Sequence, residues 1–301
     1  MIKILLGGSP CTKWSIAQKN DRETQPNSGL GWELFLNYKI ALEKYKPDYF
    51  LYENNKSASQ AIKDEICNQL GAPLQYINSA LVSAQNRERF YVHNWECPLP
   101  KDRKIYLDDI LTEGDFYPYN GGEFMRMKED LTEHYDGCWQ IGYTGKSNGQ
   151  AVRVYDLKGK SVTLKSQAGG GGGKTGLYRF NGKIYSLTAR GAEKLQTVPT
   201  GYTDCVPKEV AISLLGNGWT VEVIKHQLSY IPNILNEEIE VLSMYDGMSC
   251  GQIALEEMGC NVVRYYATEI DKYAIQTTQH NFPNTIQLGD AFQVREEGWH
   301  I

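Results

Sequence analysis

The chain opens with a regular succession of apolar runs and helical patterns. Residues 1–7 (MIKILLG) form a short apolar run that predicts a buried strand, followed by Gly8 and Ser9-Pro10-Cys11. The spacing of apolar residues then predicts a helix over 34–45, a strand over 49–52, a helix over 58–70 and a strand over 75–79. This βαβα order is typical of a largely parallel sheet with helices on both faces.

The pattern changes between about residues 96 and 185. Glycine, tyrosine and lysine become frequent, and turns such as Asn181-Gly182 separate short strand-like runs at 151–156, 176–180 and 183–187. Five consecutive glycines at 169–173 have two interpretations: a flexible linker, or backbone that approaches a ligand closely. We therefore predict a small β-rich unit in this region.

Helical patterns return at 188–196, 206–215 and 220–230, and a connector at 232–239 leads into a second βαβα unit. Its first strand runs into Tyr245-Asp246-Gly247 and a glycine turn at Gly251, before a helix over 252–257. The next strands, 262–267 and 285–288, end at Glu269, 23 residues after Asp246, and at Asp290. A glycine turn after one strand and an acid after the next are typical of nucleotide binding. The turn lacks the GxGxxG pattern, which disfavours a dinucleotide, and a generic Rossmann unit stays an alternative.

Length and composition fit one large domain with a smaller insertion. The chain has 301 residues, of which 41% are hydrophobic. We predict three segments: a catalytic part at 1–95, a β-rich unit at 96–187 and a cofactor-binding part at 188–301.

Charge is distributed unevenly along the chain. The net charge is −5, yet residues 137–203 hold ten Lys and Arg against two acids, which gives this region +8 and leaves −13 for the rest. A basic block within an acidic chain favours a separate module that contacts phosphates, although a solvated charged surface would have the same pattern.

The cysteines and histidines indicate neither disulfides nor a metal. Seven scattered cysteines form no CxxC pair, and five histidines show no metal-ligand spacing. No apolar run approaches the roughly 18 residues of a membrane span, and no signal peptide precedes the first strand. We expect a cytoplasmic monomer without metal or membrane contact.

Three segments carry candidate chemistry. Cys11 lies on a glycine- and proline-containing loop after a buried strand, where a nucleophile can be presented to a substrate. Glu53-Asn54 ends the second strand, and Gln85, Arg87 and Arg89 alternate along SAQNRERFY (83–91). A thiol, a carboxylate and paired arginines suit attack on an electron-poor ring whose nitrogen must be protonated.

These segments resemble the motifs of the DNA cytosine-5 methyltransferases. GGSPC (7–11) resembles the nucleophile loop of that family, YEN (52–54) its Glu-Asn motif and QNRERFY (85–91) its Gln-x-Arg-x-Arg motif. EVLSMYDGMSCG (240–251) resembles its S-adenosylmethionine loop, YSLTARGAEKLQTVPTGYTD (185–204) the segment that supports the recognition domain, and LLGNGWTVEVIKHQL (214–228) the helix that closes the methionine pocket. The last two are most similar to the animal de novo DNA methyltransferases and their phage relatives.

The resemblance implies a reaction and its residues. The thiolate of Cys11 would add to carbon 6 of cytosine, and carbon 5 would then take the methyl group of S-adenosylmethionine, leaving S-adenosylhomocysteine. Glu53 would bind N3 and the exocyclic amine, Arg89 the O2 atom, Arg87 would help to position the pocket and Asn54 would orient the loop. The implied cofactor contacts are Tyr245 on the adenine, Glu269 on the ribose and Asp290 on the adenine amine, with Pro10, Gly216, Asn217, Trp219, Thr220, Asp246, Gly247, Gly251 and Ile270 nearby.

The order of these motifs departs from the family. The family normally begins with the cofactor strand and reaches the cysteine later, whereas here the cysteine comes first and the cofactor unit last. We therefore predict a circularly permuted, Rossmann-like α/β methyltransferase fold with a small β-rich target recognition domain, in which Ile301 lies near Met1. The short permuted form favours a phage or mobile-element enzyme, and the sequence does not tell whether a restriction enzyme accompanies it in a restriction-modification system.

The resemblance also implies duplex DNA as partner. The target base must be flipped out of the helix before a thiolate can reach it. We expect DNA contacts from a polar flap after Cys11 (24–31) and from Ser15, Gln85, Lys165, Lys174 and Arg179. Two alternatives stay open: an RNA cytosine-5 methyltransferase, and a catalytically silent DNA-binding homologue. The target sequence cannot be predicted from side-chain identities alone.

Overall fold

The computed structural model describes residues 1–16 and 21–301, which form two compact units. Unit 1 comprises residues 1–77, 88–99 and 224–301, and unit 2 comprises 78–87 and 100–223. These bounds differ from the three predicted segments, because residues 78–87 and the helices up to residue 223 belong with the β-rich region.

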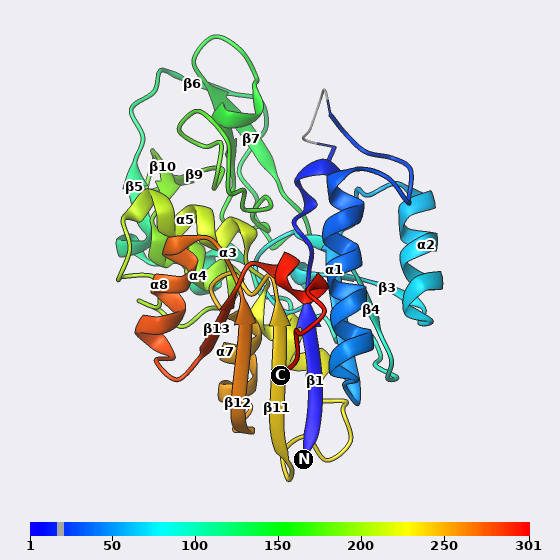
Figure 1. The fold of residues 1–301 in the computed structure, drawn as a ribbon. Coiled ribbons are helices and arrows are strands. Elements are labelled where there is room, and N and C mark those ends of the chain that lie inside the picture. Colours follow the sequence, from blue (N-terminus) through cyan, green and yellow to red (C-terminus); the bar gives the residue numbers. More distant parts are fainter. Residues whose placement is uncertain (17–20) are drawn as a thin grey trace. The chain divides into compact units, whose positions relative to one another are not determined.

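Unit 1 is built on a seven-stranded sheet in the order β13-β12-β11-β1-β2-β4-β3 (Figure 1). Strands β11 and β12, β12 and β13, β1 and β11, and β1 and β2 pair in parallel, whereas β4 pairs with β2 antiparallel. The predicted α/β class with a largely parallel sheet is confirmed. The strands are β1 (Ile2–Gly7), β2 (Tyr49–Asn55), β3 (Leu74–Asn78), β4 (Glu88–His93), β11 (Glu238–Met244), β12 (Asn261–Thr268) and β13 (Ile286–Gly289).

The sheet order identifies a switch point between β11 and β1. When the strands are numbered from β11 onward, the order becomes 3-2-1-4-5-7-6, and its first five positions follow the doubly wound pattern. In such sheets ligands bind outside the carboxyl ends of the strands, where the strand order reverses. The loops that follow β11 and β1 are therefore the place to look for a site.

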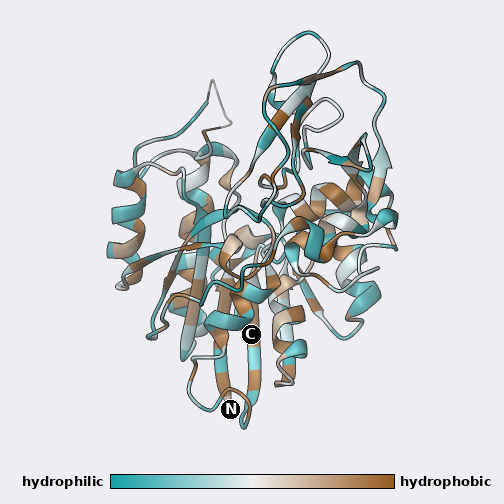
Figure 2. Cartoon of the chain, turned by 180° about the vertical axis from the view of Figure 1, so that it is seen from behind, coloured by the Kyte–Doolittle hydropathy of each residue, from teal (hydrophilic) through white to brown (hydrophobic). Residues whose placement is uncertain are grey.

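Helices cover both faces of this sheet (Figure 1). Helices α1 (Gly29–Tyr45) and α2 (Gln60–Leu70) pack with side chains such as Phe35 and Ile66 against β1, β2 and β4 in one apolar core. Helix α7 (Cys250–Glu257) lies on the opposite face, and α8 (Lys272–Asn281) joins β12 to β13. In Figure 2 the strands carry brown, hydrophobic stretches while the outer helices alternate brown and teal, as expected for helices with one buried face.

Helix α1 begins five residues before the predicted start. Part of the predicted flap, residues 29–31, is its first turn, and Gly31 N–H donates to Glu23 Oε2 over 3.0 Å. A Cβ on Gly31 would lie 2.4 Å from Nε1 of the fully buried Trp14. Glycine there lets the Cys11 loop pack tightly against the helix.

Unit 2 holds a six-stranded sheet and a set of short helices. The strand order is β5-β10-β9-β8-β7-β6, and only β8 and β9 pair in parallel. Its core contains Ile141, Val154 and Leu177. The elements are α3 (Leu107–Ile110), β5 (Phe116–Pro118), β6 (Phe124–Arg126), β7 (Gln140–Thr144), β8 (Arg153–Tyr155), β9 (Leu177–Phe180), β10 (Lys183–Leu187), α4 (Ala189–Gln196), α5 (Lys208–Asn217) and the start of α6 (Val221–Leu228).

The glycine run of unit 2 is a folded turn. Gly172 N–H donates to Ala151 O over 2.9 Å, and Gly176 N–H donates to Gly172 O over 2.9 Å. A Cβ on Gly172 would lie 2.6 Å from Leu177 Cγ. This packing excludes a structureless linker, one of the two interpretations of the sequence.

Residues near both ends of the chain pack against the last turn of α1. The Nζ atom of Lys3 lies 4.6 Å above the ring of Tyr45, and Nζ of Lys44 donates to Glu296 O over 2.7 Å and lies 5.9 Å from the ring of Trp299. Residues near both ends of the chain accordingly contact the same end of one helix.

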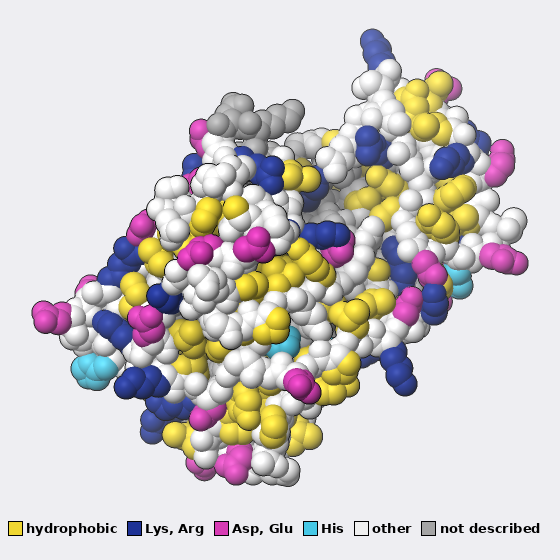
Figure 3. All heavy atoms as spheres, turned by 90° about the vertical axis from the view of Figure 1, so that its right-hand side faces the viewer, with side chains coloured by type: hydrophobic (Ala, Val, Ile, Leu, Met, Phe, Trp, Pro, Cys, Tyr) yellow, Lys and Arg dark blue, Asp and Glu magenta, His cyan; other side chains and the backbone are white. Residues whose placement is uncertain are grey.

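Charges of both signs are interspersed over the face drawn in Figure 3, with hydrophobic side chains between them. That face therefore shows no field of a single sign. Among the described residues, no helix combines the length and the apolar character needed to span a bilayer.

Candidate active site

Five of the predicted site segments lie at one edge of the unit 1 sheet. Because β11, β12, β13, β1 and β2 are parallel neighbours, their carboxyl ends share this edge. The segments are Gly8–Cys11 after β1, Glu53-Asn54 in β2, Tyr245–Gly247 after β11, Glu269 after β12 and Asp290 after β13.

A buried polar triad anchors the loop that presents Cys11. The Nδ2 atom of Asn54 donates to Ser9 O over 2.9 Å and to Tyr52 Oη over 3.1 Å, and the hydroxyls of Tyr52 and Ser9 are 2.6 Å apart. All three side chains are buried, so the loop leaves β1 in a fixed direction. Cys11 itself is half-buried at the start of the short 3₁₀ turn η1 (Cys11–Lys13).

Glu53 and Arg89 form an ion pair beside this loop. The Nε atom of Arg89 lies 3.1 Å from Glu53 Oε1, and their side chains are 13% and 11% exposed, so each keeps a small accessible surface. A Cβ on Gly8 would lie 2.8 Å from Glu53 O and 3.0 Å from Glu53 Oε2. The glycine therefore brings the Cys11 loop against the carboxylate.

Strained backbone forms the turn after β11. Tyr245 and Ser249 have φ values of 59° and 60°, which residues other than glycine rarely adopt. Gly247 has a φ of 60° as well. Tyr245 is held in place because its hydroxyl donates to Leu34 O over 2.7 Å and accepts from Asn37 Nδ2 over 3.1 Å. Such outliers cluster at ligand-binding turns.

Asp246 lies inside this turn with an altered acidity. Burial raises the pKa of Asp246 to about 6, against hydrogen bonds from Ser249 and from Tyr265 Oη at 2.8 Å, and the charge of Glu269 raises it further. The carboxylate is therefore ionised at neutral pH but is easily protonated below pH 6.

Glu269 links the ends of β11 and β12. Its Oε2 atom accepts from Gly247 N–H over 2.8 Å, and Oε1 accepts from the N–H groups of Ile270 and Asp271 over 2.7 and 2.8 Å. Oε1 thus accepts two hydrogen bonds and Oε2 one, which leaves an acceptor site on Oε2 for a ligand hydroxyl. Ile270 is 72% exposed beside it.

The donors and apolar surfaces at this edge fit a nucleoside-bearing cofactor. Tyr245 and the exposed Ile270 supply apolar surface, while Glu269 and Asp290 supply acceptors for hydroxyl and amino groups. Phe292, 37% exposed and two residues after Asp290, also belongs to this edge. Phe292 was not among the predicted site residues, although an aromatic residue two positions after the strand-end acid Asp290 could have indicated it.

Gln85 and Arg87 have internal roles in unit 2. Gln85 is fully buried, and Arg87 is 3% exposed and donates to the carbonyls of Leu164, Gly216 and Gly218 over 3.2, 3.1 and 2.9 Å. Both residues precede β4, which begins at Glu88. The predicted roles of Gln85 in contacting DNA and of Arg87 in positioning the pocket stay predictions.

The other predicted contacts of unit 2 lie at the end of α5, in strand β9 and on loops. Asn217, Trp219 and Thr220 form the turn between α5 and α6, where Thr220 is buried. Lys174 Nζ donates to Ser213 Oγ over 2.6 Å, and Arg179 pairs with Asp130 at 2.6 Å. Burial lowers the pKa of the half-buried Lys165. Ser15, in unit 1, donates its N–H to Cys11 O over 2.9 Å.

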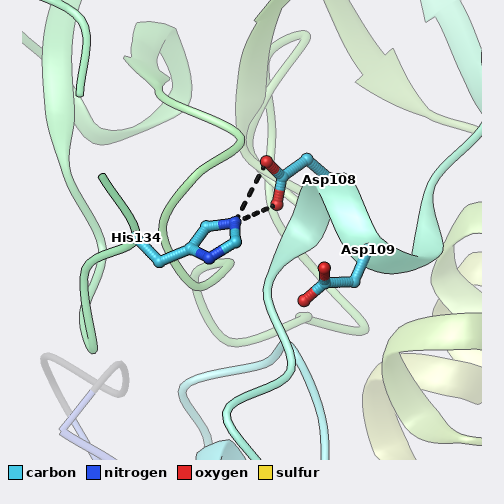
Figure 4. A group of neighbouring side chains, drawn as sticks. All are labelled: Asp108, Asp109 and His134. Atoms are coloured by element: carbon cyan, nitrogen blue, oxygen red, sulfur yellow. Dashed lines mark hydrogen bonds and ion pairs between the residues drawn. The ribbon is translucent and has the colours of Figure 1, made fainter. Parts of the chain in front are cut away.

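One group in the described part of the chain has the side chains of a metal site. Asp108, Asp109 and His134 are close together and exposed (Figure 4). His134 Nε2 already lies 3.0 Å from Asp108 Oδ1, and Asp109 Oδ2 accepts from Tyr106 N–H at the start of α3. The group is explained by these contacts, and the prediction that the protein uses no metal stays a prediction.

Sequence comparisons agree with this site. Residues 1–101, which contain Cys11, Glu53 and Arg89, match the model of the C-5 cytosine-specific DNA methylases. The type II methyltransferase M.HhaI of Haemophilus parahaemolyticus is 24% identical over 255 residues, covering 77% of this chain and 76% of that protein.

Two phage proteins are also similar. The orphan methyltransferase M.Rho11sI of Bacillus phage rho11s is 26% identical over 247 residues, covering 60% of this chain and 48% of the phage protein. The orphan methyltransferase M.SPRI of Bacillus phage SPR is 30% identical over 224 residues, covering 56% and 50%. The chain thus spans about half the length of these phage relatives. Residues 1–101, which include the Cys11 loop, thus match the C-5 cytosine-specific DNA methylase family, and the chain is similar to these three methyltransferases.

Proposed function

We propose that the protein is a DNA cytosine-5 methyltransferase that moves a methyl group from S-adenosylmethionine to a flipped-out cytosine in duplex DNA. One observation carries the proposal: Cys11 follows β1 on an anchored loop, beside the Glu53–Arg89 ion pair. A nucleophile and a carboxylate–guanidinium pair suit the two ends of a pyrimidine ring, one to be attacked and the other to be held.

Each residue of this group has one task in the reaction. The Cys11 thiolate adds to carbon 6, which makes carbon 5 nucleophilic. Glu53 binds N3 and the exocyclic amine, and supplies the proton that neutralises the ring as the adduct forms. Arg89 binds O2 and holds Glu53 in place through the 3.1 Å contact. When the proton on carbon 5 leaves to a base, the electrons of that bond expel Cys11 as a thiolate, and the proton on N3 returns to Glu53.

The cofactor supplies the methyl group from its sulfonium centre. Tyr245, Ile270, Glu269 and Asp290 would hold its nucleoside, with Asp246, Gly247 and Gly251 around the turn. The support is the acceptor pattern of Glu269 and the exposed apolar surface of Ile270. By the family resemblance, Pro10, Asn217, Trp219 and Thr220 would contact the methionine part.

Unit 2 is proposed as the target recognition domain. Its support is the basic region of 137–203 and its compact β-rich fold. Lys165, Lys174 and Arg179 are the proposed phosphate contacts, with Ser15 from the Cys11 loop. We further propose a cytoplasmic monomer in a bacterial or phage-infected cell.

We also propose that the chain is a circular permutation of the usual family order. The support is the sheet order, which becomes doubly wound when it is read from β11, and the packing of residues near both termini on α1. A chain that began at β11 would pass from β13 directly into β1.

The test is transfer of labelled methyl from S-adenosylmethionine to mixed-sequence duplex DNA. We expect label on cytosine carbon 5 with the native protein and none with Cys11→Ser, since a serine hydroxyl is too weak a nucleophile at neutral pH. Cys260→Ser is the matched control, because Cys260 lies in the turn after α7, away from the carboxyl edge. Full transfer by Cys11→Ser would overturn the mechanism, and preference for transfer RNA over duplex DNA in competition would overturn the substrate.

A further inference from the structure

A buried polar network occupies the centre of unit 2. Its side chains are at most 3% exposed and come from two segments far apart in the sequence, 79–87 and 196–220, and they hold the backbone of a third segment, 164–166. We call this network the unit 2 hub. Its members are Ser79, Ser83, Gln85, Arg87, Gln196 and Thr220.

The amide of Gln196 is the centre of the hub. Its Nε2 atom donates to Leu215 O over 2.6 Å and to Gly218 O over 2.9 Å. Its Oε1 atom accepts from Gln85 Nε2 and from Thr220 Oγ1, both over 2.9 Å. Two donors and two acceptor sites are all that an amide offers, so Gln196 is fully satisfied in a single orientation.

Gln85 and Arg87 connect this amide to the 164–166 segment. Gln85 Oε1 accepts from Leu164 N–H over 2.9 Å while its Nε2 atom holds Gln196. Arg87 donates through one nitrogen to Leu164 O and through the other to Gly216 O and Gly218 O. Leu164 is therefore held at both its N–H and its carbonyl.

The backbones of the two segments also meet directly. A Cβ on Gly216 would lie 2.4 Å from Lys165 C and 2.4 Å from Ser166 N, so only glycine allows this approach. Lys165 N–H in turn donates to Lys174 O over 3.0 Å, which ties the segment to the chain directly after the glycine run. A displacement on one side of the hub cannot occur without loss of buried hydrogen bonds or movement on the other side.

We propose that Gln196 and Arg87 are positioning residues that couple cofactor binding to DNA binding. This inference rests on the proposed function, in which Asn217–Thr220 contact the cofactor and Lys165 and Lys174 contact DNA phosphates. Whichever ligand binds first fixes its own segment, and the hub then fixes the other segment. Each ligand therefore tightens the binding of the other by the same factor.

The first test uses the native protein and S-adenosylhomocysteine without DNA. Amide hydrogen exchange is measured with and without the ligand, and the β8 amides serve as reference for general stabilisation. We expect the exchange of Leu164 N–H, which donates to Gln85, to slow at least threefold more than that of the reference. Calorimetry on the same sample reports whether the ligand binds.

The second test uses Arg87→Lys, which keeps the charge but cannot reach three carbonyls at once. For the native protein, duplex DNA that accepts methyl is expected to tighten S-adenosylhomocysteine binding at least fivefold, and Arg87→Lys to reduce this factor below twofold. In turnover with DNA present, the KM for S-adenosylmethionine should rise about fivefold while kcat changes less than twofold. Arg190→Lys is the control, since its exposed pair with Asp204 lies outside the hub.

The outcomes separate this inference from the proposed function. If S-adenosylhomocysteine binds but does not slow the hydrogen exchange of Leu164 N–H more than that of the β8 amides, the coupling is wrong and the methyltransferase proposal stands. A loss of kcat with unchanged KM in Arg87→Lys would also overturn it, because it would indicate direct participation in the reaction. If neither ligand binding nor methyl transfer occurs in the native protein, both proposals are wrong.

Discussion

At the residue scale, strand β2 divides two tasks between adjacent side chains. Successive residues of a strand point to opposite faces, so Tyr52 and Asn54 hold the Cys11 loop while Glu53 pairs with Arg89. The loop and the carboxylate are thus fixed by one short strand. Changes to Glu53 or Arg89 should therefore affect the reaction more than the fold.

Arg89→Lys tests this separation. Lysine keeps the charge but loses the planar fork, so it cannot hold Glu53 and cytosine O2 together. We expect kcat for methyl transfer to fall about a hundredfold and the thermal midpoint to change little, since lysine keeps a positive charge beside the buried Glu53 carboxylate. Single-turnover kinetics and a melting curve give the two values. A large loss of stability with normal turnover would contradict the assignment.

Asp246 gives the site a pH dependence. With a pKa of about 6, roughly a tenth of the carboxyl is ionised at pH 5 and nearly all at pH 8. If the carboxylate attracts the cofactor's ammonium group, S-adenosylhomocysteine should bind about tenfold more weakly at pH 5 than at pH 8. Calorimetry at both pH values measures this ratio.

Asp246→Asn is the control for that measurement, and its affinity should be weak and independent of pH. The folded pKa lies above the unfolded one, so ionisation costs stability as pH rises from about 4 to 6. The variant should therefore melt higher than the native protein at pH 7.5 and equally at pH 4. A steep pH dependence that persists in the variant would assign the titration to another group.

At the element scale, the helices and strands of unit 1 were predictable because each follows a simple apolar period. The predicted strand over 262–267 is β12, and the predicted helix over 58–70 is α2, which begins after the side-chain cap Ser59. The predicted roles of Gln85 and Arg87 stay predictions, since both residues precede β4 and are held by residues about 80 to 130 positions away. Such partners leave no local signal.

The glycine turn of unit 2 shows the same limit and gives a prediction. A Cβ at Gly172 would lie 2.6 Å from Leu177 Cγ and 2.8 Å from Ala151 O, whereas one at Gly169 would meet nothing within 4 Å. We expect Gly172→Ala to destabilise the protein by about 2 kcal/mol and Gly169→Ala to change its stability by less than about 0.5 kcal/mol. Chemical denaturation measures both. Equal effects would show that the run is an open linker after all.

At the scale of the whole molecule, the order of motifs in the sequence and the order of strands in the sheet both support the proposed circular permutation. The sequence predicted that Ile301 lies near Met1, and this stays a prediction; the structure places Lys3 and Trp299 against the last turn of α1. The bounds of the two units could not be predicted from the sequence. Residues 78–87 join unit 2 through buried polar contacts, which leave no apolar pattern along the chain.

A re-permuted chain tests the proposed permutation directly. Ile301 is joined to Met1 by a glycine-serine linker of ten residues, which reaches about 17 Å on average, and the chain is opened in the exposed connector between α6 and β11, before Glu237. The sheet order and the carboxyl-edge loops then keep their neighbours. The contacts at risk at the new ends are the surface ion pair between the Met1 amino group and Glu237 and the hydrogen bond from Glu237 N–H to Asn233 O. We expect a cooperative fold with a thermal midpoint within a few degrees of that of the native chain, and a rate of methyl transfer within about threefold of the native rate.

The matched control opens the chain inside α1 after Lys39. This interrupts the helix that residues near both ends pack against, and the variant should not fold. If the first variant fails to fold while its termini are shown to be linked, then the ends of the native chain do not complete one crossover from β13 to β1, and the permutation is wrong.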